Sequence, residues 1–279
     1  MILVADSGST KTAWSVLEGA MVKAEFTTLG MNPFFRSTED IVDELKNKPL
    51  PAMGSAISHV WFYGAGVVNA EKGEIIKRAL LHFCPDALID TQSDVLGACR
   101  ALFGKNSGIA CILGTGSNSC CFDGTGITNQ IPPLGFILGD EGSGAVMGKH
   151  LLGDYFKDVM PTELRLIFEN RFGLTKDEAL NRVYRDARPS HFLASLTPFL
   201  SENLAHEYCK SFIEKNFTAF IERNVTKLPG YRESNIGFVG SIAWYFSDIL
   251  KDVLKKFGIG DAVFLKDPID GLVNFHKQD

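Results

Sequence analysis

The chain has 279 residues, of which 45% are hydrophobic and 22% charged, and its formal net charge is −5. This length suits one large or two medium domains, and the apolar content is ample for buried cores, which excludes a disordered chain. A negative chain without a stripe of Lys and Arg excludes broad, nonspecific nucleic-acid binding. Because no apolar run approaches the roughly 18 residues of a membrane-spanning helix, we expect no membrane span.

The cysteines and the first residues of the chain indicate its compartment. None of the six cysteines forms a C-x-x-C pair, and those in apolar stretches, such as Cys111 and Cys121, are expected to be free thiols. The first residues begin a strand and lack the charged region and cleavage site of a secretory signal. These features fit a reducing compartment, so we expect a cytoplasmic protein.

Three strands joined by tight turns are predicted at the start of the chain, at Ile2–Ala5, Thr12–Leu17 and Met21–Thr27. The turn between the first two is Asp6-Ser7-Gly8-Ser9-Thr10-Lys11-Thr12. Its glycines allow a close backbone approach, and its hydroxyls and amides are donors that suit a phosphate. Taken singly, such a cluster is more often an ordinary turn. The order strand–turn–strand differs from the strand–loop–helix of a P-loop or a dinucleotide fold, and the glycine patterns of both are absent.

The next stretch alternates helices and strands. Pro33 keeps Asn32 out of the helical region, so Asn32 either presents its amide to a polar ligand or forms an ordinary Asn–Pro turn. Strands are predicted at His59–Tyr63 and Ala87–Asp90, a Pro- and Gly-containing link at Lys46–Ser55, and helices at Thr38–Asn47 with Thr38 as the cap, Glu71–Phe83 and Ser93–Phe103.

The second half of the chain repeats the order of the first. Strands are predicted at Ile109–Leu113, Ser119–Phe122 and Ile127–Ile131, and the turn after the first of them is Gly114-Thr115-Gly116-Ser117-Asn118. Two such turns, roughly a hundred residues apart and each following a buried strand, could hold one polyphosphate from two sides.

The remaining chain is predicted to be mainly helical. The segment Ala187–Ser201 contains two prolines and is expected to be a surface excursion. Strands are predicted at Asn235–Val239 and Ala262–Leu265, and helices at Ser143–Phe156, Glu163–Asn170, Lys176–Arg185, Glu202–Lys227, Trp244–Lys256 and from about Pro268.

Two carboxylates stand where the chemistry of phosphoryl transfer would need them. Asp6 ends the first strand beside the phosphate turn, where it could hold Mg²⁺ or accept hydrogen bonds within an ordinary turn. Asp94 stands where a strand passes into a helix, and it is either a helix cap or a general base for an attacking hydroxyl. Lys11 is either a phosphate contact or a solvated side chain.

The densest acidic cluster is Gly139-Asp140-Glu141-Gly142-Ser143-Gly144. Its two carboxylates could bind sugar hydroxyls or a metal ion. The alternative is the start of a helix, with Ser143 as its N-cap.

Taken together, these segments resemble the actin-like ATPase superfamily of sugar kinases, chaperone ATPases and actin. Within it, Leu113–Asn118 and Gly139–Ser143 are most similar to the N-acetylglucosamine kinase branch, grouped with the BadF/BadG/BcrA/BcrD ATPases. The likeness covers nearly the whole chain and keeps the order of the first phosphate, first connecting, second phosphate and adenosine motifs, at Asp6–Thr12, Ser93–Ala98, Gly114–Asn118 and Phe238–Ser241.

This resemblance implies an α/β protein of two ribonuclease H-like domains with a nucleotide cleft between them. The N-terminal domain would span residues 1–104 and be joined by the C-terminal helix, residues 268–279, and the C-terminal domain would span residues 105–267 with a helical insertion. The implied activity is ATP- and Mg²⁺-dependent phosphorylation of an N-acetylated amino sugar, most simply of N-acetylglucosamine to its 6-phosphate. Because dimers are common in this family, a homodimer is a further expectation.

The resemblance also implies a role for each motif residue. Asp94 would be the catalytic base, and Asp6 would hold Mg²⁺, directly or through water. The phosphates would contact Ser7, Gly8, Ser9, Thr10, Lys11, Gly114, Thr115 and Gly116, the adenosine would lie at Gly240 and Ser241, and the sugar would bind Asn32, Ser117, Asn118, Gly135 and Asp140.

Departures from the family pattern leave alternatives open. Vertebrate members have a Trp-Gly pair where this chain has Leu134-Gly135, so the sugar pocket could differ from theirs. A close alternative is a kinase of N-acetylmuramate or glucosamine. A BadF-type activator of a dehydratase would need a cluster held by cysteines, for which Cys120 and Cys121 are the suggestive pair. A non-enzymatic scaffold that binds ATP is the third alternative.

Overall fold

The computed structural model describes residues 1–277, and the chain divides into two compact units. The first unit comprises Met1–Asn106, Asp123–Ile127 and the chain from Asp267 onward. The second comprises Ser107–Phe122 and Thr128–Lys266. The first unit therefore holds both the beginning of the chain and its last helix.

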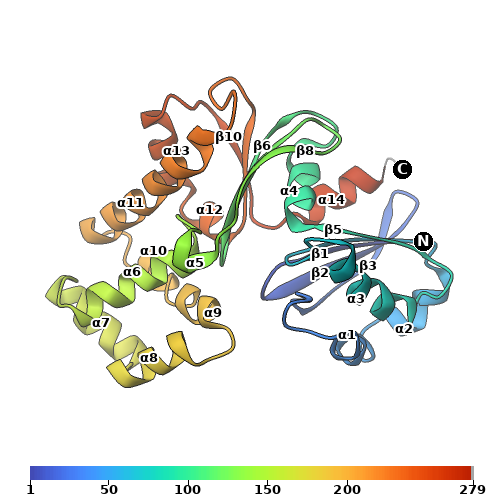
Figure 1. Ribbon diagram of the computed structural model, residues 1–279, viewed down its shortest axis with the longest axis horizontal. Helices are drawn as coiled ribbons and strands as arrows, with labels where there is room; N and C mark the ends of the chain where they lie inside the picture. The colour runs from blue at the N-terminus through green and yellow to red at the C-terminus, as the bar shows by residue number, and fades with distance from the viewer. Residues whose placement is uncertain (278–279) are drawn as a thin grey trace. The chain divides into compact units, whose positions relative to one another are not determined.

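The sheet of the first unit has five strands in the order β3-β2-β1-β4-β5 (Figure 1). β1 pairs antiparallel with β2 and parallel with β4, and β5 extends the parallel part. Because β1, β4 and β5 are parallel, their carboxyl ends meet at one edge of the sheet. The strand bounds are β1 Ile2–Ser7, β2 Lys11–Glu18, β3 Met21–Leu29, β4 His59–Gly64 and β5 Leu88–Ser93.

Helices cover both faces of this sheet. Successive residues of β1 point to opposite faces and are nevertheless buried, because each face packs against helices. Leu3 and Ala5 belong to one apolar cluster with residues of α1 and α3, whereas Val4 packs with Leu272 of α14. α4 lies on the same face as α14 (Figure 1). The helices of this unit are α1 Thr38–Leu45, α2 Leu50–Met53, the 3₁₀ turn η1 Gly54–Ala56, α3 Ala70–Leu81, α4 Asp94–Phe103 and α14 Ile269–His276.

The sheet of the second unit repeats the first. Read from β8, its order is β8-β7-β6-β9-β10, and β6 pairs antiparallel with β7 and parallel with β9, as β1 does with β2 and β4. The predicted α/β class and the repeated strand–turn–strand order are both confirmed. The strands are β6 Gly108–Leu113, β7 Ser117–Phe122, β8 Ile127–Ile131, β9 Ile236–Val239 and β10 Ala262–Leu265.

Most of the second unit is helical, and its apolar core is built around Phe168, Phe199 and Phe217. In residues 1–277 we find no helix with the length and apolar character needed to cross a membrane. The helices are α5 Gly135–Leu138, α6 Gly144–Phe156, α7 Thr162–Phe172, α8 Lys176–Tyr184, α9 Pro189–Ala194, α10 Pro198–Glu202, α11 Glu207–Arg223, the 3₁₀ turn η2 Val225–Lys227, α12 Ser241–Tyr245 and α13 Ser247–Lys256.

The prediction of a surface excursion at Ala187–Ser201 is wrong. The two prolines begin α9 and α10, where a missing N–H costs nothing. Both helices bury large side chains in the core, among them Phe192 and Phe199. The prolines therefore mark helix starts.

Smaller corrections concern helix ends. Ser37, not Thr38, caps α1, because its hydroxyl accepts a hydrogen bond from the Asp40 amide. The link at Lys46–Ser55 contains the short helix α2, and the helix expected from Glu202 begins only after His206, which caps α11. The helix expected at Trp244–Lys256 is two helices, α12 and α13.

Candidate active site

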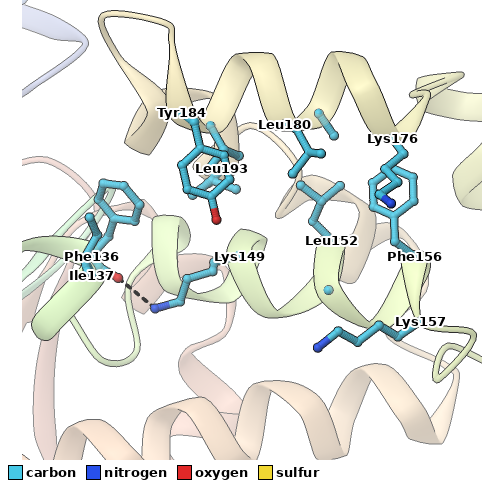
Figure 2. A pocket seen from close by; sticks show the side chains of 13 residues that line it. Phe136, Ile137, Lys149, Leu152, Phe156, Lys157, Lys176, Leu180, Tyr184 and Leu193 are labelled. Atoms are coloured by element: carbon cyan, nitrogen blue, oxygen red, sulfur yellow. Dashed lines mark hydrogen bonds between the residues drawn. The ribbon is translucent and has the colours of Figure 1, made fainter.

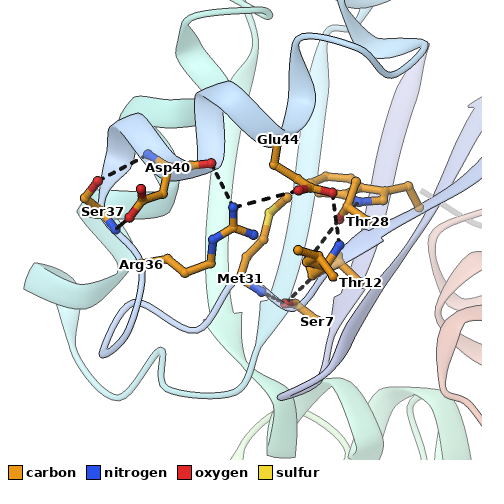
Figure 3. A network of polar contacts seen from close by, with 10 residues as sticks. Ser7, Thr12, Thr28, Met31, Arg36, Ser37, Asp40 and Glu44 are labelled. Carbon is orange, nitrogen blue, oxygen red and sulfur yellow. Dashed lines mark hydrogen bonds and ion pairs between the residues drawn. The ribbon is translucent and has the colours of Figure 1, made fainter. Parts of the chain in front are cut away.

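The first phosphate turn is held by hydrogen bonds within it and from the loop behind it (Figure 3). The buried Ser7 hydroxyl lies 2.8 Å from the Thr12 hydroxyl and accepts a hydrogen bond of 3.0 Å from the Met31 amide. The Gly8 amide donates to the Lys11 carbonyl at 3.0 Å. Ser7 therefore fixes the shape of the turn, while Thr10 and Lys11 are exposed on it.

A glycine is required where the next loop crosses this turn. The Gly30 amide donates to the Thr10 carbonyl at 2.9 Å, and a Cβ on Gly30 would lie 2.5 Å from the Gly8 carbonyl oxygen. Any side chain there would displace the turn. Farther back, Glu44 of α1 accepts a hydrogen bond from the Leu29 amide at 3.2 Å and lies 3.9 Å from Arg36, which ties α1 to the strand beside the turn (Figure 3).

Asp6 and Asp94 lie at the edge where the parallel strands of the first sheet end. Asp6 is in β1 opposite Tyr63 of β4, and Asp94 follows the end of β5. Removal from solvent, and then repulsion from Asp94 and Asp267, raises the pKa of Asp6 to about 7, with Lys11 acting in the opposite direction. Both carboxylates thus lie at the same edge of the sheet, close enough for the charge of Asp94 to raise the pKa of Asp6.

Asp94 is not the cap of its helix. The N-cap of α4 is Ser93, whose hydroxyl accepts a hydrogen bond from the Leu96 amide at 3.3 Å. Asp94 is the first helical residue, and its carboxylate accepts a hydrogen bond from the Val95 amide at 3.0 Å. Removal from solvent outweighs that hydrogen bond and raises the pKa of Asp94 to about 6, which makes its carboxylate a stronger base than an exposed one.

The donor set of this edge fits Mg²⁺ better than it fits zinc. Asp6 offers hard oxygen ligands, and the cation that opposes the rise of its pKa is the exposed Lys11, which lies 3.7 Å from Asp267. Over residues 1–277, no group of three or more His, Cys, Asp and Glu side chains is arranged to hold a metal ion. Mg²⁺ needs no such cage, because it usually binds one or two carboxylates together with substrate phosphates and water.

The second phosphate turn lies at the start of α6. The Gly144 amide donates to the Gly114 carbonyl at 2.8 Å, and the Ala145 amide donates to the Thr115 carbonyl at 3.0 Å. Gly240, at the end of β9, has a φ of 118°, and a Cβ on it would lie 2.4 Å from the Leu113 carbonyl oxygen. The end of β9 thus packs directly on this turn, with the exposed Ser241 next to it.

Asp140 adopts an unusual backbone conformation beside this turn. Its φ of 56° lies in the left-handed region, which is costly for a residue with a side chain. Its carboxylate lies over Gly116, where a Cβ would come within 3.0 Å of an Asp140 oxygen, and it accepts a hydrogen bond from the Ser117 amide. Burial raises the pKa of Asp140. Strain of this kind is typical of functional sites.

A hollow of about 130 Å³ lies next to Asp140 in the second unit. Its polar wall includes Ser117, Asn118 and Asp140 from the predicted set. The Asn118 side-chain oxygen accepts hydrogen bonds of 2.9 Å from both the Ser119 amide and Gln130, so this amide is held in one orientation. The hollow also has an apolar wall, formed by Ile131, Pro132, Pro133, Leu134 and Leu138.

Glu141 pairs with two residues of the same hollow that the sequence did not indicate. Its carboxylate lies 2.5 Å from Nε of Arg223 and accepts a hydrogen bond of 3.3 Å from Asn224. Arg223 and Asn224 are far from any motif in the sequence, and only the folded chain brings them to the hollow beside Asp140. The side chain of Glu141 is mostly buried, which makes this pair part of the wall.

Two predicted sugar contacts lie outside this hollow. Gly135 is exposed at the start of α5 and does not line it. Asn32 belongs to the first unit, where its side-chain oxygen accepts a hydrogen bond of 2.9 Å from the Phe34 amide and packs against Gly66. The predicted residues therefore form two sets, one with Asp6 and Asp94 in the first unit and one with Gly114, Asp140 and Gly240 in the second.

Comparison with solved structures identifies the family. A Porphyromonas gingivalis protein provisionally named N-acetylglucosamine kinase is 40% identical to the chain, with a TM-score of 0.95 over 100% of this chain and 99% of that one. The chain belongs to the N-acetylglucosamine kinase family. No family model matches the sequence, and no curated protein matches it either.

More distant structures confirm the fold of this family member. A Chromobacterium violaceum protein with the same provisional name is 15% identical, with a TM-score of 0.75 over 98% of both chains. A ROK family glucokinase from Streptomyces griseus, solved with glucose and AMPPNP, is 14% identical, with a TM-score of 0.57 over 98% of this chain and 97% of that one. The predicted fold class, the α/β fold of actin-like ATPases, is thereby confirmed.

Proposed function

We propose that this protein is a cytoplasmic, ATP-dependent kinase that phosphorylates N-acetylglucosamine on its 6-hydroxyl. The observation that carries the proposal is Asp94, a carboxylate with a pKa raised to about 6 at the end of the parallel strands, in a chain of the N-acetylglucosamine kinase family. A base with that pKa is largely ionised near neutral pH and still binds a proton readily.

In this proposal Asp94 accepts the proton of the sugar hydroxyl as its oxygen attacks the γ-phosphorus. Phosphoryl transfer requires positioning and charge neutralisation more than covalent help from the protein. Asp6 is the side chain that would hold Mg²⁺, directly or through water. When bound, the ion would neutralise charge on the phosphate oxygens.

The two phosphate turns account for nucleotide binding. In the first turn, the internal bonds of Ser7 leave Thr10 and Lys11 exposed as donors, and the Gly8 and Ser9 backbone allows a close approach. In the second unit, Thr115 with Gly114 and Gly116 would contact the same phosphates. Gly240 and Ser241, packed beside that turn, would contact the adenosine.

The hollow beside Asp140 favours a neutral amino sugar. Asp140, Ser117 and Asn118 offer acceptors and donors to hydroxyls, and the apolar wall suits an acetyl methyl group. Asn32 and Gly135, which lie outside this hollow, stay predicted contacts that rest on the family resemblance alone. N-acetylmuramate carries a lactyl carboxylate, which would need a free cation. The arginine of this hollow, Arg223, is already paired with Glu141, so we place N-acetylglucosamine before N-acetylmuramate.

The alternative of a BadF-type activator receives less support. Adjacent residues of a strand point to opposite faces, and Cys120 is buried in β7 whereas Cys121 is partly exposed. The pair therefore does not present two thiolates to one cluster.

The test is ADP release from Mg·ATP with a panel of N-acetylglucosamine, N-acetylmuramate, glucosamine, N-acetylmannosamine and glucose. We expect the first sugar to stimulate turnover most, and Asp94→Asn to lower kcat by about 10²- to 10⁴-fold with little change in nucleotide affinity. Asp90→Asn is the matched control, because Asp90 lies in β5 but is bound to His59 at 2.7 Å.

Turnover that no sugar raises, or an Asp94→Asn variant as active as Asp90→Asn, would contradict the proposal. Light scattering on the same preparation measures whether the protein is the homodimer that we propose from its family.

A further inference from the structure

A second hollow of the second unit lies between α6 and α8 (Figure 2). Its volume is about 580 Å³, within the range of roughly 300–1,000 Å³ that is usual for small-molecule sites. Leu180 reaches from α8 toward Leu152 of α6, Tyr184 reaches from α8 toward Lys149 of α6, and Phe156 is the last residue of α6. None of these side chains takes part in the proposed kinase reaction.

The charge around this hollow is of one sign. Among the described residues that line it are three lysines, Lys149, Lys157 and Lys176, and no aspartate or glutamate. The chain as a whole has a net charge of −5, so a purely positive lining is a local feature. An apolar floor edged by ammonium groups is complementary to a molecule with an apolar body and an anionic end.

One of the three lysines connects this hollow with the loop of Asp140. Lys149 of α6 donates a hydrogen bond of 2.8 Å to the carbonyl of Phe136, which lies in α5 (Figure 2). α5 ends at Leu138, two residues before Asp140, and the positive charge of Lys149 also favours the ionised form of Asp140. A ligand that attracts Lys149 would loosen the contact that holds α5.

We propose that this hollow binds a small amphipathic carboxylate, with its apolar part between Leu152 and Leu180 and its carboxylate at Lys149. Binding then exchanges the Lys149 bond to Phe136 for an ion pair and alters the segment from Gly135 to Gly142. The site is distinct from the sugar and phosphate residues, so this proposal does not depend on the kinase activity.

The binding test uses 8-anilinonaphthalene-1-sulfonate, a fluorescent aromatic anion, with octanoate and octylammonium as competitors. We expect saturable binding of one molecule per chain, displaced by octanoate and not by octylammonium. Lys149→Met replaces the ammonium group by an apolar side chain of similar length. It should raise the Kd of the dye about threefold, the effect expected for the loss of a partly exposed ion pair.

Two leucine variants distinguish this hollow from the rest of the helical surface. Leu180→Glu places a carboxylate in the hollow and should weaken binding at least about tenfold, through repulsion and lost apolar contact. Leu166→Glu is the matched control, because Leu166 of α7 is similarly exposed, at 56% against 44% for Leu180, and lies outside the hollow. Far-ultraviolet circular dichroism checks that all three variants fold.

Hydrogen exchange measures whether ligand binding changes residues 135–142, the segment that contains Asp140, without any assay of activity. Octanoate should speed exchange in residues 135–142 of the wild type, and Lys149→Met should show the faster exchange before octanoate is added.

Unsaturable dye binding, or equal affinity of Leu180→Glu and Leu166→Glu for the dye, would overturn the site. Binding without a change in residues 135–142 would overturn the connection to Asp140. A lower mass of Leu180→Glu in light scattering would show instead that the hollow is an interface between copies.

Discussion

The ionised carboxylate of Asp6 is needed for the proposed activity but lowers the free energy of unfolding. This carboxylate has little compensating charge, because Asp94 and Asp267 repel it while Lys11 opposes them. In the folded state its pKa is about 7 against an ordinary value of 3.8, so folding favours the protonated form. A cation bound at this carboxylate would remove the penalty, which is the behaviour expected of a metal-binding side chain.

We predict that Asp6→Asn raises the free energy of unfolding while it abolishes Mg·ATP-dependent turnover. Between pH 4 and pH 7 the folded state binds more protons than the unfolded state, so the penalty grows with pH and is complete above about pH 7. At pH 8 the variant should gain about 2 kcal/mol, allowing for partial exposure of the side chain, and at pH 4 nothing.

Urea unfolding at the two pH values measures this difference. Of the three tryptophans, Trp14 and Trp61 belong to the first unit and Trp244 to the second, so a Trp244→Phe background makes the fluorescence specific for the unit with Asp6. A gain that is the same at pH 4 and pH 8 would show that ionisation is not its cause.

The site could be predicted from the sequence only where its residues belong to a motif. Asp6, Asp94 and Asp140 each adjoin a glycine turn or begin a helix, and such local patterns are visible in a linear chain. Arg223 and Asn224 reach Glu141 from the end of α11, more than eighty residues farther along the chain (83 for Asn224). No local pattern marks them, because their role depends on tertiary packing alone.

At the level of elements, α6 depends on a glycine at which no side chain fits. A Cβ on Gly148 would lie 1.9 Å from the carbonyl oxygen of Leu193 in α9, so the two helices touch through their backbones. Gly153, five residues along the same helix, has no atom within 4 Å of its Cβ position. The two glycines therefore form a matched pair in one helix.

We predict that Gly148→Ala lowers the free energy of unfolding by about 3 kcal/mol, because α6 and α9 must separate. Gly153→Ala should raise it by about 0.5 to 1 kcal/mol, since alanine loses less backbone freedom on folding. Urea unfolding followed by far-ultraviolet circular dichroism measures both. Equal effects of the two substitutions would mean that α6 and α9 do not touch through their backbones in solution.

The elements themselves could be predicted to different degrees, for a physical reason. β1 and β6 begin as short apolar runs and lead into glycine turns, and their pattern is unambiguous. α9 and α10 have only six and five residues, too few to show a helical repeat, and their prolines are equally typical of loops. Burial of Phe192 and Phe199, rather than local propensity, makes them helices.

At the scale of the whole molecule, the first unit is completed by the last helix of the chain. The chain leaves this unit after Asn106 and, apart from Asp123–Ile127, returns only at Asp267. α14 then covers one face of the first sheet, where Leu272 is fully buried against Val4 and Leu17. Its last residue, His276, stacks on Trp61 with ring centroids 4.5 Å apart and bonds the Tyr63 hydroxyl at 2.8 Å.

We predict that Leu272→Ala lowers the free energy of unfolding of the first unit by about 2 to 5 kcal/mol and leaves the second unit unchanged. In the Trp244→Phe background, Trp61 reports directly on this change because α14 packs against it. Leu250→Ala, at an equally buried leucine of α13, is the control and should destabilise the second unit alone. If both variants shift the tryptophan transition equally, the two units unfold as one. If only Leu272→Ala does, the part of the first sheet that α14 covers, around Val4 and Leu17, stays exposed during synthesis until the final helix docks, after the whole second unit has been made.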